Sequence, residues 1–345
     1  MKEFFPWSTA VYKTAVEKYI NGRLSILDIQ VSGACNYNCI YCDSPDRLLS
    51  CQIDFDHLEN LIRKDPNLYE WMFVCGLGEP LWAKNKHILL RLLSICKELG
   101  IKCSIFTNGS QMDEQIFDYI RTGILYPIIK VDTFSRTSSC KIYGTSEASK
   151  TIDAIDTLFE ISRNFGNRGC HVAASIVPTA KNRGEILDIV KKCIENNVFP
   201  LLGQLEYAGN AIGTYNDLLL SKDDLIKLKD DISEAIGEEY KVPICPSVIA
   251  GLHITNDGWI SVDKRSGLSC SWFWLETPQI VKLCEVNSIN SFKEADYAII
   301  EYRKSVIMQM TELTKKIEVF PFGGCGGNVK DLAEDYVKLQ TSQIG

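Results

Sequence analysis

The sequence predicts an α/β fold built on a parallel sheet, followed by a smaller α+β domain. Between residues 24 and 209, apolar or alternating segments take turns with segments of helical periodicity, which is the pattern of β/α repeats. Beyond Gly213 this repeat stops, and alternating segments flank Asn256-Asp257-Gly258, a strong signal for a β-hairpin. These changes place the two expected domains at residues 20–220 and 240–345.

The expected elements follow in chain order. The first strand is expected at Leu24–Val31, where apolar side chains alternate with Asp28 and Gln30, and the segment DFDHLENLIRK after it has helical spacing. Five further strands are expected in EWMFVCGLGEP, IKCSIFTNGS, LYPIIKVDTF, GCHVAASIVPT and FPLLGQLEYAG. The helices between them are expected at 86–99, 113–121, 151–164 and 184–196. Ser221 opens a capping-box match, SKDD, which predicts another helix.

Polar and glycine-rich segments come at the carboxyl end of every expected strand. The first strand leads into CNYNCIYC, and the later ones end in GLGEP, TNGS, KVDTF, SIVPT and LEYAG. In β/α barrels the active site lies at the carboxyl ends of the strands, so we expect these segments to form one site.

The bulk composition is that of an ordinary globular protein, with 46% hydrophobic and 23% charged residues. A net charge of -7 opposes phosphate backbones, so no nucleic-acid partner is expected. The N-terminus lacks a secretory signal, and no apolar run approaches the roughly 18 residues that span a bilayer. We therefore expect a cytoplasmic protein with no membrane association, where 14 cysteines favour metal binding or catalysis over disulfides.

Cys35, Cys39 and Cys42 lie in CNYNCIYC with the spacing C-x3-C-x2-C. A structural zinc ion needs four ligands, usually as two pairs, and the nearest further candidate is Cys51. Thiols that only fill space are a second alternative, against which the polar neighbours of the cysteines argue. The favoured hypothesis is a 4Fe–4S cluster held by three thiolates, which leaves one iron open to a cofactor or substrate.

This triplet at the end of the first strand of a β/α chain resembles the radical S-adenosylmethionine (radical SAM) superfamily, with Tyr41 at the family's usual aromatic position. The resemblance implies a partial (β/α)6 TIM-like barrel of the radical SAM type. It also implies that S-adenosyl-L-methionine (SAM) chelates the open iron through its amino and carboxylate groups. Reductive cleavage of SAM would give methionine and a 5′-deoxyadenosyl radical, which abstracts hydrogen from a substrate C–H bond.

Ordered matches on the later strands imply further contacts to SAM. In GLGEP, Gly76, Gly78 and Glu79 resemble the motif that holds the SAM amino group. The fourth strand carries Lys130 and Asp132, whose side chains the resemblance directs to the SAM carboxylate or ribose. The remaining implied contacts are Asn108 in the turn after the third strand, Ser175 on the fifth strand beside the adenine, and Glu206 at the end of the sixth.

Four cysteines of the C-terminal region resemble the ligands of a twitch or SPASM auxiliary-cluster domain. Cys245 and Cys270 flank the hairpin, Cys325 lies in FGGCGGN, and Cys284 stands where the family often has a glycine. Because the C-x2-C pairs for a further cluster are missing, the resemblance implies one auxiliary 4Fe–4S cluster in a twitch-like domain. The alternative is an ordinary scatter of buried thiols.

The resemblance implies a radical SAM oxidoreductase or maturase. Peptide modification, by oxidation, cross-linking or epimerisation, is the first hypothesis, and a dehydrogenase or epimerase acting on a sugar or aminoglycoside is the alternative. A non-catalytic iron–sulfur or zinc scaffold is the remote alternative. A one-electron reductant such as flavodoxin or ferredoxin is the expected partner. Cys140, in the polar loop after the fourth strand, is a candidate hydrogen donor to a substrate radical, or else a loop thiol without function.

Overall fold

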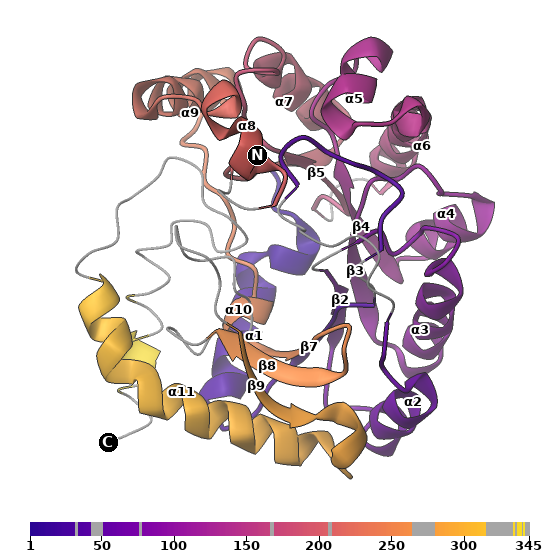
Figure 1. Cartoon of the computed structure of the whole chain (residues 1–345), viewed down its shortest axis with the longest axis vertical. Helices are drawn as coiled ribbons and strands as arrows, with labels where there is room; N and C mark the ends of the chain where they lie inside the picture. The colour runs from indigo at the N-terminus through magenta and orange to yellow at the C-terminus, as the bar shows by residue number, and fades with distance from the viewer. Residues whose placement is uncertain are drawn as a thin grey trace.

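One sheet of nine strands forms the centre of the molecule (Figure 1). The structure is a computed structural model that describes residues 1–31, 34–42, 51–75, 78–165, 169–205, 209–263, 280–314, 334, 337–339 and 341. The strands are β1 (Ile26–Ile29), β2 (Trp71–Val74), β3 (Lys102–Thr107), β4 (Leu125–Lys130), β5 (Val172–Ile176), β6 (Val198–Leu202), β7 (Gly251–Ile254), β8 (Trp259–Asp263) and β9 (Ile280–Glu285).

The strands follow the order β6-β5-β4-β3-β2-β1-β7-β8-β9. Strands β1 to β7 pair in parallel, whereas β8 and β9 pair antiparallel. Within the described residues the edge strands β6 and β9 do not pair with each other, so the sheet stays open. The predicted α/β fold with a partial barrel is therefore confirmed.

Helices pack around the sheet, and most match an expected segment. The helices are α1 (Thr9–Ile20), α2 (Phe55–Lys64), α3 (Lys86–Leu99), α4 (Glu114–Arg121), α5 (Arg136–Tyr143), α6 (Ser149–Asn164), α7 (Ile186–Glu195), α8 (Ala211–Leu218), α9 (Lys222–Ile236), α10 (Ser247–Ala250) and α11 (Phe292–Thr314); the 3-10 turns are η1 (Phe5–Trp7), η2 (Ser146–Ala148) and η3 (Val286–Ser288). The predicted cap is confirmed, because the Ser221 side chain accepts a hydrogen bond from the backbone N–H of Asp224 at 3.1 Å. The sequence pattern does not predict α1, α5, α8, α10 or α11.

The N-terminal segment closes the amino end of the barrel. The ring of Phe5 lies 5.8 Å from Trp71, 5.5 Å from Tyr126 and 5.9 Å from His171, measured between ring centroids. These partners stand at or next to the first residues of β2, β4 and β5. Trp7 follows in the same turn and is only 2% exposed, so an aromatic plug fills the end of the barrel opposite the carboxyl ends of the strands.

The C-terminal strands extend the sheet of the N-terminal part. Strand β7 pairs in parallel with β1, from Ile26 opposite Gly251 to Ile29 opposite Ile254. The predicted hairpin at residues 256–258 is confirmed between β7 and β8, and its turn places Gly258 at φ +83°, which glycine adopts at no steric cost. Helix α11 packs along β7, β8 and β9 (Figure 1). The division into domains 20–220 and 240–345 stays a prediction.

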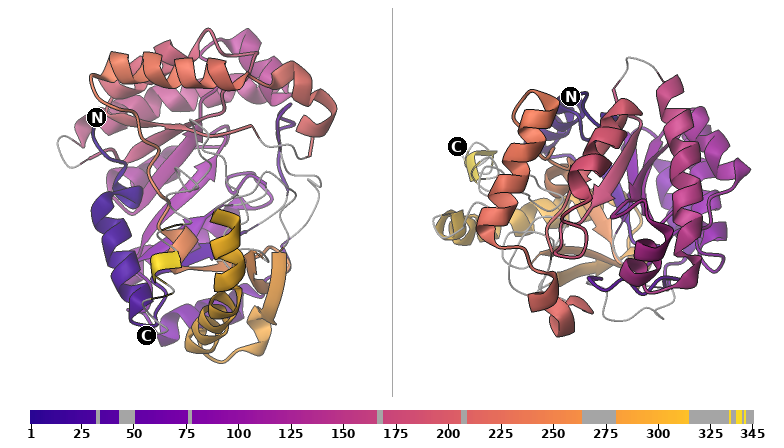
Figure 2. Two further views of the ribbon diagram at one scale, coloured as in Figure 1. Left: turned by 90° about the vertical axis from the view of Figure 1, so that its left-hand side faces the viewer. Right: turned by 90° about the horizontal axis from the view of Figure 1, so that it is seen from above.

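Figure 2 shows that helices α8 and α9 lie at one end of the molecule and α11 at the other. Between them the carboxyl ends of β1 to β6 face a common interior. None of the described helices combines the length and the apolar character that crossing a membrane requires.

Candidate active site

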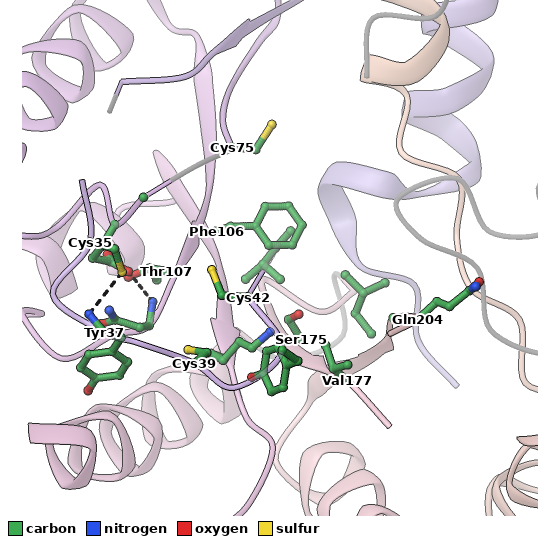
Figure 3. Close-up of a pocket in the computed structure, with 18 of the residues that line it drawn as sticks. Cys35, Tyr37, Cys39, Cys42, Cys75, Phe106, Thr107, Ser175, Val177 and Gln204 are labelled. Atoms are coloured by element: carbon green, nitrogen blue, oxygen red, sulfur yellow. Dashed lines mark hydrogen bonds between the residues drawn. The ribbon is translucent and has the colours of Figure 1, made fainter. Parts of the chain in front are cut away.

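A cavity of about 260 Å³ lies inside the barrel and reaches the carboxyl ends of six parallel strands (Figure 3). Each strand or the segment after it contributes to the lining: Cys39 after β1, Cys75 after β2, Thr107 on β3, Lys130 on β4, Ser175 on β5 and Gly203 after β6. The parallel strands therefore bring these segments together at one site, as expected from the sequence.

Hydrogen bonds join the loop of the three cysteines to the turn after β3. Asn36 donates from Nδ2 to Ser110 Oγ at 2.9 Å, and its Oδ1 accepts from Asn108 Nδ2 at 2.9 Å. Tyr37 Oη lies 2.8 Å from Thr151 Oγ1, whose hydroxyl donates to the Asn108 carbonyl at 2.7 Å. The loop is therefore fixed on one side by buried polar contacts.

Two other segments hold the remaining sides of the loop. The backbone N–H of Ile40 donates to the carbonyl of Ile142 at 2.9 Å, near the end of α5. Gly144 caps α5 at φ +64°, and a Cβ there would overlap the Asn38 carbonyl. From the opposite direction, the backbone N–H of Asn210 donates to the Cys42 carbonyl at 2.8 Å.

The three thiols fit a cluster better than a single metal ion. Cys35, Cys39 and Cys42 are half-buried and all line the same cavity. Within the described residues, no three His, Cys, Asp or Glu side chains converge as a single tetrahedral ion requires. A cubane binds each thiolate through a different iron, so its ligands need not meet at one point. Burial raises the pKa of the Cys39 thiol, which the ammonium of Lys130 opposes.

Glu79 is a buried carboxylate on the cavity wall. Its Oε1 accepts hydrogen bonds from Thr107 Oγ1 at 2.6 Å and from the backbone N–H of Leu81 at 3.0 Å. Its Oε2 accepts from the backbone N–H of Asn108 at 2.6 Å. Burial raises the pKa of Glu79 to about 7, although these hydrogen bonds favour the ionised form.

Lys130 is a cation that lines the same cavity. Its Nζ lies 4.4 Å from the ring centroid of Tyr41, at cation–π distance. The hydroxyl of Tyr41 donates to Asp132 Oδ2, and Asp132 Oδ1 accepts from the backbone N–H of Val177 at 2.8 Å. Asp132 is fully buried and is not part of the cavity lining, so it positions Tyr41 beneath Lys130.

The other residues implied to contact SAM fall into two groups. Gly78, Asn108 and Ser175 line the cavity, and Gly78 has φ +86°, a conformation that favours glycine. Gly76 and Glu206 lie outside the described residues.

Cys140 lies on helix α5 and not in a loop, which corrects the sequence prediction for this segment. The segment RTSSCKIY is mostly polar, so its helical periodicity is weak, and the cap from Ser135 to the backbone N–H of Ser138 at 3.2 Å starts the helix. The Cys140 thiol donates to the carbonyl of Ser146 at 3.8 Å and does not belong to the cavity lining. Its role as a hydrogen donor stays a prediction that this placement does not favour.

The C-terminal cysteines are spread over both faces of the sheet. Cys245 is buried next to a small chamber inside the barrel. Cys284 pairs with Ile260, which in turn pairs with Ile254, and these residues point away from His253 and the barrel interior. Cys270 and Cys325 lie outside the described residues.

Sequence reasoning assigned no role to three residues of the interior, Trp7, Asp28 and His253. The signal for Asp28 was present, since a charged residue in the middle of a strand buried on both faces is unusual. Trp7 and His253 carried no local signal, because their positions depend on the N-terminal plug and on the pairing of β7 with β1.

Residues 29–198 match the family model of the Radical SAM superfamily. The chain is similar to the uncharacterized protein MJ0804 of Methanocaldococcus jannaschii, with 25% identity over 223 residues, 60% of this chain and 71% of that protein. It is also similar to a GTP 3′,8-cyclase of Ectopseudomonas mendocina, with 24% identity over 229 residues, 65% of this chain and 67% of that protein.

Two solved structures share the fold. SuiB of Streptococcus suis, bound to the precursor peptide SuiA, superposes with a TM-score of 0.56 at 16% identity, over 84% of this chain and 68% of that chain. The structure of native anSMEcpe with bound AdoMet superposes with a TM-score of 0.59 at 15% identity, over 90% of this chain and 95% of that chain. At these identities the likeness concerns the fold alone.

Proposed function

Since residues 29–198 match the family model of the Radical SAM superfamily, we propose that this chain cleaves SAM reductively and abstracts hydrogen from a substrate in the barrel cavity. The observation that carries the proposal is that Cys35, Cys39, Cys42, Glu79 and Lys130 line one cavity. When bound, a 4Fe–4S cluster and SAM would supply one-electron reduction and a 5′-deoxyadenosyl radical for attack on a C–H bond.

Different residues of this chain would bind the cluster and SAM. The three thiolates of the CNYNCIYC loop hold the cluster, with each sulfur directed to the same cavity. Glu79 and Lys130 supply opposite charges to the lining of this cavity, which suits the ammonium and the carboxylate of the SAM methionyl group. Phe106, Ile128 and Leu202 add apolar surface to the lining, which limits the access of water to reactive species.

We propose one auxiliary 4Fe–4S cluster ligated by Cys245, Cys270 and Cys325, of which Cys245 lies at the barrel interior. Cys284 is left out, because its register places it on the other face of the sheet. In a protein whose first three cysteines are Ala, the remaining iron should approach the four atoms of one cubane. Cys270→Ala should lower that iron content sharply, and full retention would show that these cysteines bind no cluster.

The proposal includes two classes of substrate, a peptide and a sugar or aminoglycoside. Peptide modification is supported by the shared fold with SuiB bound to the precursor peptide SuiA and with anSMEcpe bound to the Cp18Cys peptide. A sugar or aminoglycoside is favoured by a buried polar group, Asp28, which lines a small chamber adjoining the cavity. Either reaction needs a one-electron reductant, for which flavodoxin or ferredoxin is the proposed partner.

The test is anaerobic reconstitution with iron and sulfide, followed by reduction in the presence of SAM. The wild-type protein should be brown and should form 5′-deoxyadenosine, measured by mass spectrometry. The variant with Cys35, Cys39 and Cys42 replaced by Ala should form none. A colourless zinc protein, or equal 5′-deoxyadenosine from the triple variant, would overturn the proposal.

A further inference from the structure

A buried carboxylate lies near the amino end of the cavity. Asp28 is only 1% exposed, although it lies in the middle of β1. Its Oδ1 accepts a hydrogen bond from Cys75 Sγ at 2.8 Å, and its Oδ2 accepts from Ser247 Oγ at 2.7 Å. His253 stands opposite Asp28 in the β1–β7 register, with Nδ1 at 3.5 Å from Oδ1. Four separate elements therefore meet at this side chain.

Asp28 has no strong cationic partner in the described part of the chain. No Lys or Arg there lies within ion-pair distance of it, and His253 counts as a partner only when protonated. A carboxylate has room for about four hydrogen bonds, so the contacts from Cys75 and Ser247 leave acceptor sites open. A charge removed from water without a partner is strongly unfavourable, so this position suits a cationic ligand group.

A small chamber lies directly beside Asp28. Its volume is about 20 Å³, enough for one group of the size of water. Trp7, Cys75, Phe106 and Ile128 line both this chamber and the main cavity, so the two spaces adjoin. The chamber is therefore placed to receive one small polar group of a molecule that lies in the main cavity.

Trp7 supplies an unmatched donor at the same place. Its side chain is 2% exposed, and its Nε1 has no hydrogen-bond partner among the residues that the structure describes. A buried indole N–H normally finds an acceptor. The residues that line the chamber thus include a carboxylate for a cation and an indole donor for a hydroxyl oxygen.

We propose that this chamber, formed by Trp7, Asp28, Cys75 and Ser247, binds the ammonium group of an amino sugar or aminocyclitol whose ring occupies the main cavity. The ammonium donates to Asp28, and a neighbouring ring hydroxyl accepts from Trp7 Nε1. A lysine side chain offers the same cation, but it carries no neighbouring hydroxyl for the indole. This inference rests on the proposed function in that the ring supplies the C–H bond that is attacked.

The test is binding to the full-length, reconstituted protein with SAM present, measured by calorimetry under anaerobic conditions. The probes are D-glucosamine, D-glucose and a capped Ala-Lys-Ala peptide. Wild-type protein should bind glucosamine at least tenfold more tightly than glucose and than the peptide, because only glucosamine carries both groups. Asp28→Asn should remove the preference for glucosamine over glucose. Asp296→Asn changes a buried carboxylate of α11, outside the barrel lining, and should keep that preference.

Three results would overturn the inference: equal binding of the two sugars, a glucosamine preference that survives Asp28→Asn, or tighter binding of the peptide. If Asp28→Asn does not fold, Trp7→Phe keeps an aromatic ring in the plug and removes the indole N–H together with part of the ring system. It should weaken glucosamine binding at least threefold in protein that still shows a cooperative melting transition, and unchanged binding would contradict the inference. Formation of 5′-deoxyadenosine by the same wild-type sample is scored separately, so failure of the proposed function is distinguished from failure of this one.

Discussion

The carboxylate of Glu79 accepts a hydrogen bond from the backbone N–H of Asn108 at 2.6 Å, which ties the segment after β2 to the turn after β3. Within the described residues this carboxylate accepts hydrogen bonds from the Thr107 hydroxyl and from two backbone N–H groups. The same carboxylate lines the cavity. Glu79 therefore both holds two segments of the site together and supplies a carboxylate to the cavity.

Glu79→Gln should weaken SAM binding about tenfold, because the amide brings an N–H toward backbone donors and removes the negative charge. Burial raises the pKa of Glu79 to about 7, so the carboxylate ionises as the pH rises through that value. Wild-type affinity for SAM should increase between pH 6 and pH 8, whereas the Gln variant should change less. Equilibrium dialysis of the reconstituted proteins measures both, and parallel pH profiles would contradict this role.

Lys130→Met should also lower SAM affinity about tenfold, since it removes a cation from the cavity wall but keeps a side chain of similar length. Lys130→Arg should retain most of the affinity. Lys150→Met serves as the control, because Lys150 forms an exposed ion pair with Glu147 at 3.6 Å on the outside of the barrel. If Lys130→Met and Lys150→Met bind SAM equally well, Lys130 does not contact it.

Gly144→Ala should displace the loop of the three cysteines. The backbone at Gly144 has φ +64°, and the added Cβ would overlap the Asn38 carbonyl. Gly100→Ala is a matched control, because Gly100 also caps a helix, at φ +71°, with open space around its Cβ position. The control should lose about 1 kcal/mol of unfolding free energy and keep its iron, whereas Gly144→Ala should lose more than about 2 kcal/mol and part of its iron. Equal losses in urea titrations would show that the loop tolerates the change.

Asp296→Asn should flatten the dependence of stability on pH. Asp296 on α11 accepts hydrogen bonds from Tyr69 Oη at 3.3 Å and from the backbone N–H of Leu24 at 3.4 Å, and burial raises its pKa to about 7. A raised carboxyl pKa favours the protonated form in the folded state. Its stabilising contribution is therefore complete below the unfolded pKa near 4 and is lost as the pH rises through 7.

The amide variant cannot ionise, and its Nδ2 can donate to the Tyr69 hydroxyl, which also accepts hydrogen bonds. Relative to wild type, Asp296→Asn should gain on the order of 2–4 kcal/mol of unfolding free energy between pH 4 and pH 8. Urea titrations at several pH values measure this difference. A difference that stays constant with pH would show that Asp296 is already ionised at low pH in the folded protein.

The sequence by itself determined the features that local patterns encode. Alternation and helical spacing predicted the strands β1 to β6, the helices from α2 to α9 that have clear apolar faces, and the hairpin at Asn256-Asp257-Gly258. The spacing of Cys35, Cys39 and Cys42, at the carboxyl end of a strand, predicted where the site lies. Parallel topology then brought the motifs of the later strands to the same cavity.

Tertiary structure decided which side chains meet across long separations in the chain. Asp28 and His253 face each other only because β7 pairs with β1, and Asp132 can hold the Tyr41 hydroxyl at the cavity wall only because α5 and β5 pack beside it. Cys245 and Cys284 are both candidate cluster ligands in the sequence but lie on opposite faces of the sheet. Periodicity and turn chemistry are properties of residues that are neighbours in the chain. The register of the strands, and the face of the sheet on which a side chain lies, depend instead on how the whole sheet is buried, and no short segment of sequence encodes this.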